Sequence, residues 1–396
     1  MATDSTHNHP PVRVFHLITT LSPGGAEMML EKLVRTMDRR AFPCRVASLV
    51  PGGVVGDRIR GLGIEVEDLS LSRGRPRPGA VLKLARLLRD FSPQVVQTWM
   101  YHADLLGLAA ARLARTGRVA WNIRCSDLDL SAYSRMTALT VRACALLSRF
   151  PDAVVANSSA GREFHRRLGY HPKRFPVIGN GFDLSRFVPD PKARDAVRRE
   201  LGVPAGAPLV GLVARWDPAK DHAAFFQAAG LLVRDGSDAR FVLCGQGVDP
   251  DNPDLARWIR EQGLSGRVSL LGLRDDVPRI MAALDVFASS SRSEGFPNVL
   301  GEAMASGVPC AVTDVGDSAE VVGEWGVIVP PGDPQALAMA VGGLLALSPD
   351  ARKALGALAR ERVGRLYSME AVARAYEDLY RELAGCAVGK GPEIKT

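Results

Sequence analysis

Residues 293–303 read Ser-Glu-Gly-Phe-Pro-Asn-Val-Leu-Gly-Glu-Ala and follow a short apolar run, Leu284 to Ala288, that is typical of a buried strand. Pro297 has a preset φ and no N–H to lose, so it fits the first position of a helix. We predict that this helix runs from Asn298 to Ala305. Strand, turn and helix in this order form the repeating unit of a doubly wound parallel sheet.

The start of this predicted helix combines an anion site with two carboxylates. Its first turn has free N–H groups and a partial positive charge, so it can hold a phosphate. Glu294 precedes the helix and Glu302 lies about one turn inside it, and helical side chains lean toward the N-terminus, so both carboxylates can face this end. A carboxylate there is suited to accept hydrogen bonds from ligand hydroxyls. Phosphate and hydroxyls together describe a nucleotide sugar; the alternative is an ordinary acidic bias at a helix start.

The spacing of Glu294 and Glu302, with Gly-Phe-Pro-Asn between them, resembles the E-x7-E motif of retaining glycosyltransferases of family 4 (group 1), and is similar to polysaccharide and O-antigen-type members. The resemblance covers nearly the whole chain. It implies the α/β fold called GT-B, in which two Rossmann-like doubly wound parallel-sheet domains face a cleft. It also implies that a C-terminal helix crosses back to the N-terminal domain.

The chain has 396 residues, which suits two domains of about 150–200 residues each better than one core. The segment Val188-Pro-Asp-Pro191 is typical of a linker. We therefore expect an N-terminal domain that binds the acceptor, a C-terminal domain that binds the nucleotide sugar, and a polar tail at each end. The predicted bounds are 12–187 with about 367–387 for the first domain, 188–366 for the second, and 1–11 and 388–396 for the tails.

Five candidate site residues of the first half follow predicted strands. A strand over 12–18 runs into the pair Gly24-Gly25, and paired glycines let a ligand approach the backbone closely. His102 follows the strand 94–99, at the edge where α/β sheets bind ligands, and the family resemblance places a His near the donor sugar. Arg124 ends another strand and can bind an acceptor phosphate or carboxylate, with Tyr101 as a second acceptor contact. A capping or buried role is the alternative for His102.

Two cations of the second half suggest a phosphate clamp. Arg215 and Lys220 follow the predicted strand 209–214, and Asp221 can cap the helix after them. Arginine supplies a planar fork and lysine a mobile point charge. This loop is similar to the diphosphate-binding loop of the same family. Taken alone, such a pair of cations is common on protein surfaces.

The resemblance assigns further roles. Arg215 and Lys220 offset charge on the leaving nucleoside diphosphate in place of a metal ion, Glu302 holds ribose hydroxyls and Glu294 holds donor-sugar hydroxyls. Neither a cofactor nor a metal is expected, and the donor is a UDP-, GDP- or ADP-sugar. We interpret Asp127-x-Asp129, a metal motif in a different transferase fold, as coincidence. The loop carrying Arg274 contacts the nucleobase, and backbone groups near the phosphate and sugar come from Phe296, Pro297, Asn298 and Val299.

Positive charge is concentrated in the first half. The net charge is +7, yet residues 1–190 carry 27 Lys and Arg against 16 Asp and Glu. This excess favours an anionic partner such as a phospholipid surface, with the loop 72–79 and the helix 82–91, which carries Lys83, Arg86 and Arg89, as the contact. An ordinary solvated surface is the alternative.

The N-terminus is polar, and no run of about 18 apolar residues occurs. We therefore expect a cytoplasmic protein, peripheral at the inner face of the membrane. The six cysteines lack metal-ligand spacing, which predicts reduced thiols.

The sequence thus predicts a hexosyltransferase-like glycosyltransferase (EC 2.4) that acts on a lipid-linked or cell-surface glycan. Retention of anomeric configuration is implied by the resemblance alone, as is the glycan acceptor, because the segments 99–102 and 123–124 are similar to members that build surface polysaccharides. Two alternatives remain open: a sugar-nucleotide epimerase of the same fold, or a non-catalytic nucleotide-sugar-binding protein. Binding to nucleic acid is not expected, because the chain has no basic helix–turn–helix and no aromatic platform.

Overall fold

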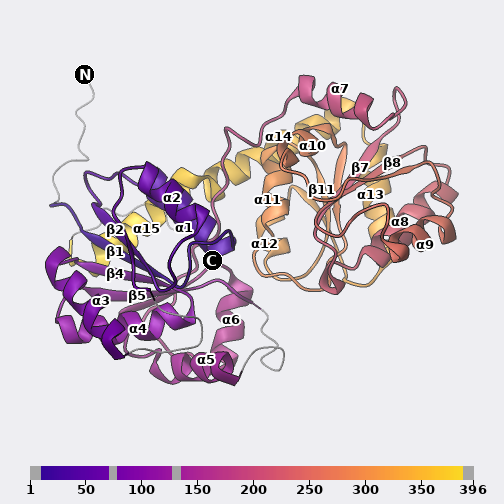
Figure 1. Ribbon diagram of the computed structural model, residues 1–396. Coiled ribbons are helices and arrows are strands. Elements are labelled where there is room, and N and C mark those ends of the chain that lie inside the picture. The colour runs from indigo at the N-terminus through magenta and orange to yellow at the C-terminus, as the bar shows by residue number, and fades with distance from the viewer. Residues whose placement is uncertain (1–9, 71–77, 127–134, 387–396) are drawn as a thin grey trace, which may run out of the picture. The chain divides into compact units, whose positions relative to one another are not determined.

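The computed structural model describes residues 10–70, 78–126 and 135–386. The chain divides into two compact units (Figure 1). Unit 1 comprises Met1–Gly181 and Met369–Thr396, and unit 2 comprises Phe182–Ser368. Among the described residues no helix is both long and apolar enough to cross a bilayer.

Unit 1 is built on a six-stranded parallel sheet with the order β3-β2-β1-β4-β5-β6. Strand β1 pairs with both β2 and β4, so that Val14 lies opposite Cys44 on one side and Val95 on the other. The strands are β1 (Val14–Ile18), β2 (Cys44–Ser48), β3 (Val66–Asp68), β4 (Val95–Trp99), β5 (Arg118–Ile123) and β6 (Ala153–Ala156). The helices are α1 (Gly25–Thr36), α2 (Val54–Gly61), α3 (Pro78–Phe91), α4 (Tyr101–Ala114), α5 (Arg135–Leu147), α6 (Ser159–Arg167) and α15 (Met369–Leu383).

Unit 2 repeats the same topology, with the order β12-β11-β10-β7-β8-β9 and all strands parallel. Its strands are β7 (Leu209–Val213), β8 (Arg240–Cys244), β9 (Val268–Leu270), β10 (Val286–Ser289), β11 (Cys310–Thr313) and β12 (Gly326–Val329). Its helices are α7 (Pro191–Glu200), η1 (Pro218–Lys220), α8 (His222–Arg234), α9 (Pro253–Glu261), α10 (Val277–Ala283), α11 (Asn298–Ala305), α12 (Ser318–Val322), α13 (Pro334–Ala346) and α14 (Pro349–Tyr367).

The central strands have the composition that this architecture requires. All five residues of β1, β4 and β7 are buried, since helices cover both faces of each sheet. In unit 1 the core on one face joins β1 to α1 and α15, through residues such as Leu30 and Tyr376, and the core on the other joins it to α3, α4 and α5. The predicted α/β fold with two doubly wound sheets is confirmed.

The chain passes between the units twice, at 181–182 and at 368–369. In unit 2 the Phe182 N–H donates to the Tyr367 carbonyl over 2.8 Å, and the Phe182 ring fills the space where a Cβ of Gly301 would stand. In unit 1 Gly181 lies against Met369. The expected linker at 188–191 is therefore several residues too late, because the aromatic contacts of Phe182 already belong to unit 2. The C-terminal helix α15 packs in unit 1, as the resemblance implied.

Some helices were not predicted. Helix α7 begins at Pro191, inside the expected linker, because the Asp190 carboxylate accepts a hydrogen bond from the Ala193 N–H over 3.0 Å and Pro191 suits a first helical position. Residues 101–104, which follow the predicted strand 94–99, form the first turn of α4.

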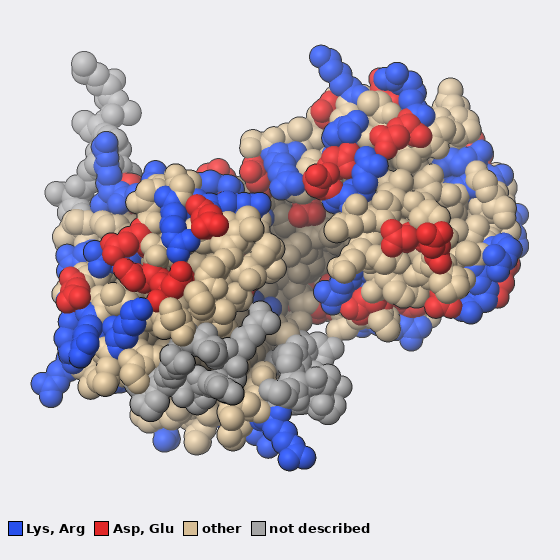
Figure 2. All heavy atoms as spheres, in the orientation of Figure 1, with Lys and Arg blue, Asp and Glu red and all other residues tan. Residues whose placement is uncertain are grey.

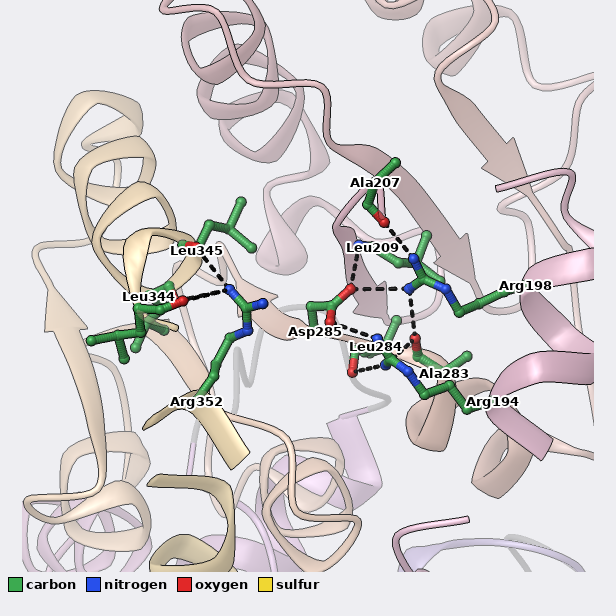
Figure 3. Close-up of polar contacts among 11 residues, drawn as sticks. Arg194, Arg198, Ala207, Leu209, Ala283, Leu284, Asp285, Leu344, Leu345 and Arg352 are labelled. Carbon is green, nitrogen blue, oxygen red and sulfur yellow. Dashed lines mark hydrogen bonds and ion pairs between the residues drawn. The ribbon is translucent and has the colours of Figure 1, made fainter. Parts of the chain in front are cut away.

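Asp285 joins α7 to the sheet of unit 2 (Figure 3). Its carboxylate lies 2.7 Å from Arg194 Nη2 and 3.0 Å from Arg198 Nη1, and it accepts a hydrogen bond from the Leu209 N–H over 2.8 Å. Burial alone would raise the pKa of Asp285, but the charge of Arg194, the hydrogen bonds and Arg198 outweigh it and lower the pKa. A second arginine, Arg352, donates to the carbonyls of Leu344 and Leu345 and so caps the end of α13 (Figure 3).

We expect Asp285→Asn to lower the free energy of unfolding by about 2 kcal/mol, because two arginines lose a partly buried anionic partner. Denaturant titration would measure it. Since the folded pKa is depressed, Asp285 stabilises the fold above its unfolded pKa and loses this effect as pH falls through the folded value. The difference between wild type and variant should therefore shrink in acid. Asp57→Asn, at an exposed ion pair, is the control and should change stability little.

Candidate active site

The candidate residues of unit 2 cluster at the point where the strand order reverses. Strands β7 and β10 are neighbours, yet the chain runs outward from them in opposite directions. Lys220 follows β7 and Glu294 follows β10, so both lie at the carboxyl edge of the sheet. Ligands of doubly wound sheets bind in the crevice outside the strand ends at such a reversal.

Lys220 and Glu294 form an ion pair there. Lys220 Nζ lies 2.6 Å from Glu294 Oε1, and both side chains are largely buried, with exposed fractions of 19% and 11%. The Ser291 hydroxyl donates to the same carboxylate oxygen over 2.7 Å. The Ser290 hydroxyl donates to the Lys220 carbonyl over 2.9 Å. Sequence reasoning named the lysine and the glutamate but missed the serines, whose only signal was their place at the end of a strand.

Arg215 stands apart from this pair. Its guanidinium lies 2.8 Å from Asp217 Oδ2 and is mostly exposed. Asp217 also caps η1, and the hydrogen bond from the Ala219 N–H is the main reason that its pKa is lowered. Because η1 is so short, the caps at Asp217 and Asp221 hold the whole loop 215–221 in shape. Arg292 reinforces it, with Nε 2.5 Å from Asp221 Oδ2.

The loop that carries Glu294 is fixed by the neighbouring strand β11. The Thr313 hydroxyl donates to the Ser291 carbonyl over 2.6 Å, and the Asp317 N–H donates to the Gly295 carbonyl over 3.0 Å. A Cβ on Gly316 would come within 2.3 Å of the Glu294 carbonyl, and its φ of +56° also favours glycine. The backbone around Glu294 is therefore set by close packing, which holds the carboxylate in place.

Helix α11 begins at Asn298 and ends at Ala305, as predicted. Pro297 is the cap residue before the helix and not its first residue, because its backbone is still extended. Glu302 lies half-buried inside the helix, and Asn298 and Val299 form its first turn. Phe296 is buried, with its ring 6.1 Å from Phe182 and 5.5 Å from Tyr367 between centroids, so its side chain belongs to the core.

The Arg274 side chain forms ion pairs with two acidic residues of unit 2. Its guanidinium lies 2.7 Å from Asp276 Oδ1 and 3.0 Å from Glu200 Oε1, and these hydrogen bonds raise its pKa. The side chain therefore ties the loop after β9 to α7.

Unit 1 has its reversal between β1 and β4, and the candidates Gly24, Gly25 and His102 follow these two strands. A Cβ on Gly24 would come within 2.4 Å of the Glu27 carboxylate, whereas Gly25 has open space around it. His102 is exposed in the first turn of α4, and partial desolvation lowers its pKa. The lowered pKa favours the neutral imidazole, which can both donate and accept a hydrogen bond.

Arg124 is held by a network that includes the C-terminal helix. Its guanidinium donates to the Asn180 side-chain oxygen, contacts the Tyr376 hydroxyl and lies 5.5 Å from the centre of the Trp99 ring. The Tyr376 hydroxyl also accepts a hydrogen bond from Asn122 Nδ2 over 2.6 Å, and its ring stacks on Trp99. Sequence reasoning missed Asn122 and Tyr376, because no local pattern relates residues that are about 250 positions apart.

The side chain of Tyr101 does not fit the acceptor contact that was expected. It is buried, and its hydroxyl lies 2.9 Å from His165 Nε2. His165 Nδ1 in turn lies 2.8 Å from the Gly161 carbonyl. Successive residues of a helix are rotated by about 100°, so Tyr101 faces the core while His102 faces out.

A metal site was not expected. Among residues 10–70, 78–126 and 135–386, no group of three or more His, Cys, Asp or Glu could hold a metal ion. Asp127 and Asp129 lie outside the described residues. None of the cysteines in the described part of the chain forms a disulfide.

Two family models match these units. The model described as "Glycosyltransferase Family 4" matches residues 23–186, and the one described as "Glycosyl transferases group 1" matches residues 207–346. A 2-deoxystreptamine N-acetyl-D-glucosaminyltransferase of Streptomyces fradiae is 34% identical and aligns over 93% of each chain. The chain belongs to the family 4, group 1 glycosyltransferases. This membership favours glycosyl transfer over epimerisation and over non-catalytic binding.

The chain is also similar to a second relative in sequence and to a crystal structure in fold. An Escherichia coli UDP-Gal:alpha-D-GlcNAc-diphosphoundecaprenol alpha-1,3-galactosyltransferase is 26% identical over 60% of this chain and 62% of its own length. The crystal structure of Anabaena Alr3699/HepE in complex with UDP has a TM-score of 0.79 and 24% identity, covering 93% of this chain and all of that one. That likeness confirms the GT-B fold.

We expect Lys220→Ala to lower turnover by about two to three orders of magnitude without unfolding unit 2, because the variant removes a positioned positive charge from the site. Steady-state kinetics and thermal unfolding would measure the two effects. Lys192→Ala, an exposed lysine on α7, is the matched control. Turnover near the wild-type value in Lys220→Ala would exclude the lysine from the mechanism.

We expect Tyr376→Phe to raise the KM for the acceptor and to leave the affinity for the donor nucleotide unchanged, because the lost hydroxyl holds Asn122 and Arg124 in unit 1. The free energy of unfolding should fall by about 1–2 kcal/mol, since the buried Asn122 amide loses its hydrogen-bond acceptor. Tyr380→Phe is the control, because the buried Tyr380 hydroxyl has no hydrogen-bond partner among the described residues. Equal effects of the two variants on the acceptor KM would contradict this role for Tyr376.

Proposed function

We propose that unit 2 binds a nucleotide-diphosphate sugar at the reversal between β7 and β10, and that unit 1 binds the acceptor. The observation that carries this proposal is the ion pair of Lys220 with Glu294, a cation and a hydroxyl acceptor held 2.6 Å apart at the strand ends. A sugar diphosphate needs both groups side by side. The first turn of α11 adds N–H groups for a phosphate oxygen.

The roles of the residues follow from their chemistry. Lys220, with Arg215 on the same loop, offsets the negative charge that grows on the leaving nucleoside diphosphate, which lowers the barrier to breaking the glycosidic bond. When a donor phosphate forms an ion pair with Lys220, the Glu294 carboxylate becomes available to accept hydrogen bonds from donor-sugar hydroxyls. Glu302 accepts hydrogen bonds from the ribose, and the backbone near Phe296, Pro297, Asn298 and Val299 contacts phosphate and sugar.

In unit 1 the same edge of the sheet serves the acceptor and the reacting sugar. Gly25 leaves the backbone open to close approach, and the imidazole of His102 can donate or accept a hydrogen bond. Arg124, fixed by Asn180 and Tyr376, suits a phosphate or carboxylate of the acceptor. Retention of anomeric configuration is part of the proposal, and NMR of the product would test it.

We further propose that the donor is a UDP-sugar, which the UDP in the Anabaena HepE complex supports. A thermal-shift series with UDP, GDP and ADP tests the base. A ligand at 100 times its dissociation constant stabilises by about 2.7 kcal/mol, so UDP should raise the melting temperature most. A larger shift with GDP or ADP would reassign the nucleotide, and no shift with any of them would overturn donor binding by unit 2.

The proposed acceptor is a lipid-linked diphosphate glycan, which would place the enzyme peripherally at the cytoplasmic face of a membrane. The name of the Escherichia coli relative, which specifies a diphosphoundecaprenol substrate, supports it. The Streptomyces relative, named for the small molecule 2-deoxystreptamine, supports a soluble acceptor instead. Transfer of radiolabelled sugar to an organic-extractable product, compared with a water-soluble one, separates the two.

We expect transfer to survive EDTA, because cationic side chains and a helix N-terminus meet the donor phosphates in this proposal. Turnover with and without a chelator measures it. Complete loss with EDTA and rescue by manganese would contradict this role for Arg215 and Lys220, and would direct attention to Asp127 and Asp129.

A further inference from the structure

Helix α5 carries an unusual exposed face. Leu139 and Leu146 are 62% and 71% exposed, and Met136, in the first turn, is 53% exposed. Arg135 and Arg142 are exposed beside them. At 3.6 residues per turn, Arg135, Leu139, Arg142 and Leu146 fall within an arc of about 60°. The opposite face, with Thr140, Val141, Cys144 and Ala145, is buried. The helix therefore presents a narrow stripe in which leucine alternates with arginine.

The stripe continues past the end of the helix. Phe150 is 41% exposed, and the guanidinium of Arg149 lies 5.0 Å from the centre of its ring. No acidic residue occurs from 135 to 150. An exposed apolar stripe normally costs solubility, and here every cation in it is arginine, whose guanidinium is weakly hydrated and binds phosphate.

Helices α3 and α4 extend this surface. They pack beside each other and α4 packs beside α5, so the three form one layer over the sheet of unit 1 (Figure 1). Leu82 and Leu113 are also exposed on this layer. Its exposed cations outside α5 are Lys83, Arg86, Arg89, Arg112 and Arg115.

Acidic charge is almost absent from the three helices. Asp90 is exposed, and the other acid, Asp104, is fully buried. Figure 2 shows acidic and basic side chains intermixed on the visible faces of both units. The three helices, with the residues that follow them, carry a large share of the basic excess of the first half of the chain.

We propose that the α3–α4–α5 layer is a docking surface for an anionic phospholipid bilayer, with the α5 stripe inserted at the level of the headgroups. A helix whose exposed face carries leucine together with arginine can lie in the interfacial plane of a membrane, with leucine at the acyl boundary and arginine at the phosphates. Each cation near an anionic surface adds attraction that salt screens. A second copy of this chain is a poorer occupant, because a two-fold contact would bring the arginines of α5 against each other.

The position of α5 relates this surface to the acceptor. Strand β5 ends at Ile123, next to Arg124, and α5 runs back from this edge to the start of β6. Its N-terminal end therefore lies toward the edge of the sheet where His102 and Arg124 stand. A bilayer along α5 would present a lipid-linked acceptor at this edge. The inference thus rests on the proposed lipid-linked acceptor and adds the surface that meets the lipid.

The expectation from sequence alone placed the membrane contact at the loop 72–79 and α3. Of that region, residues 71–77 lie outside the described residues, so the arginines at 73, 75 and 77 are not described. Lys83 and Arg89 are exposed, but Lys83 Nζ donates to the Asp68 carbonyl over 2.7 Å and Arg89 Nη2 to the Leu113 carbonyl over 3.0 Å. The apolar residues that a bilayer would take up lie mainly on α5.

Flotation of the full-length protein with phosphatidylglycerol vesicles tests the proposal. We expect binding at about 0.05 M salt and much weaker binding at about 0.5 M. Leu139→Gln/Leu146→Gln should weaken binding by about tenfold or more at both salt concentrations. Arg142→Gln/Arg149→Gln should weaken it by about tenfold or more at low salt only. Neutral phosphatidylcholine vesicles should bind far less than phosphatidylglycerol.

Matched exposed residues of unit 2 supply the controls. Met339→Gln/Leu358→Gln removes two apolar groups that are 69% and 39% exposed, and Arg234→Gln/Arg260→Gln removes exposed arginines. Both should bind vesicles as the wild type does. The UDP-induced thermal shift should be unchanged in the two α5 variants, because the nucleotide groups lie in unit 2. It should also be unchanged in the two unit 2 controls, because their residues are not among the proposed nucleotide groups.

Three outcomes would overturn the docking surface. They are a wild type that ignores anionic vesicles at low salt, an α5 leucine variant that binds normally, and a concentration-dependent oligomer that this variant abolishes. The nucleotide measurement keeps the two proposals apart. A normal UDP shift with no vesicle binding would overturn the docking surface alone, whereas the absence of any nucleotide shift would overturn the proposed function.

Discussion

The reversal of strand order in each sheet is the constraint on which the rest of this glycosyltransferase depends. Parallel strands put all their carboxyl ends at one edge, and right-handed connections on both sides of β7 and β10 carry their loops away from each other. Lys220 and Glu294, far apart in sequence, meet there because their strands are neighbours. Unit 1 repeats the arrangement with β1 and β4, which brings Gly24 and His102 to a common edge.

Side-chain packing then fixes the conformation of the loops that carry Lys220 and Glu294. The Lys220–Glu294 pair is partly buried, so each charge depends on the other and on Ser291 for compensation. Gly316 admits the Glu294 backbone where any side chain would collide with it. Such a site is preorganised, because the groups that would meet a diphosphate and a sugar already stand in place before either arrives.

Helix α15 links the end of the chain to the beginning. Tyr376 stacks on Trp99 and contacts both Asn122 and Arg124, so a helix that follows unit 2 in sequence completes the polar network of unit 1. Truncation before this helix would expose the apolar face of unit 1 that Tyr376 and Tyr380 cover. The position of Arg124 is thus a property of both ends of the chain.

The sequence by itself determined the two α/β units and the helix Asn298–Ala305, and it named Lys220 and Glu294 as candidates, because periodicity, capping residues and strand–loop order are local signals. Only the tertiary structure decided that Tyr101 faces inward while His102 faces out. It decided that Arg274 forms ion pairs with Asp276 and Glu200, and that the Tyr376 hydroxyl contacts Arg124. It also decided that the exposed leucines gather on α5. These outcomes depend on which helices and strands pack side by side, and local sequence patterns do not specify those neighbours.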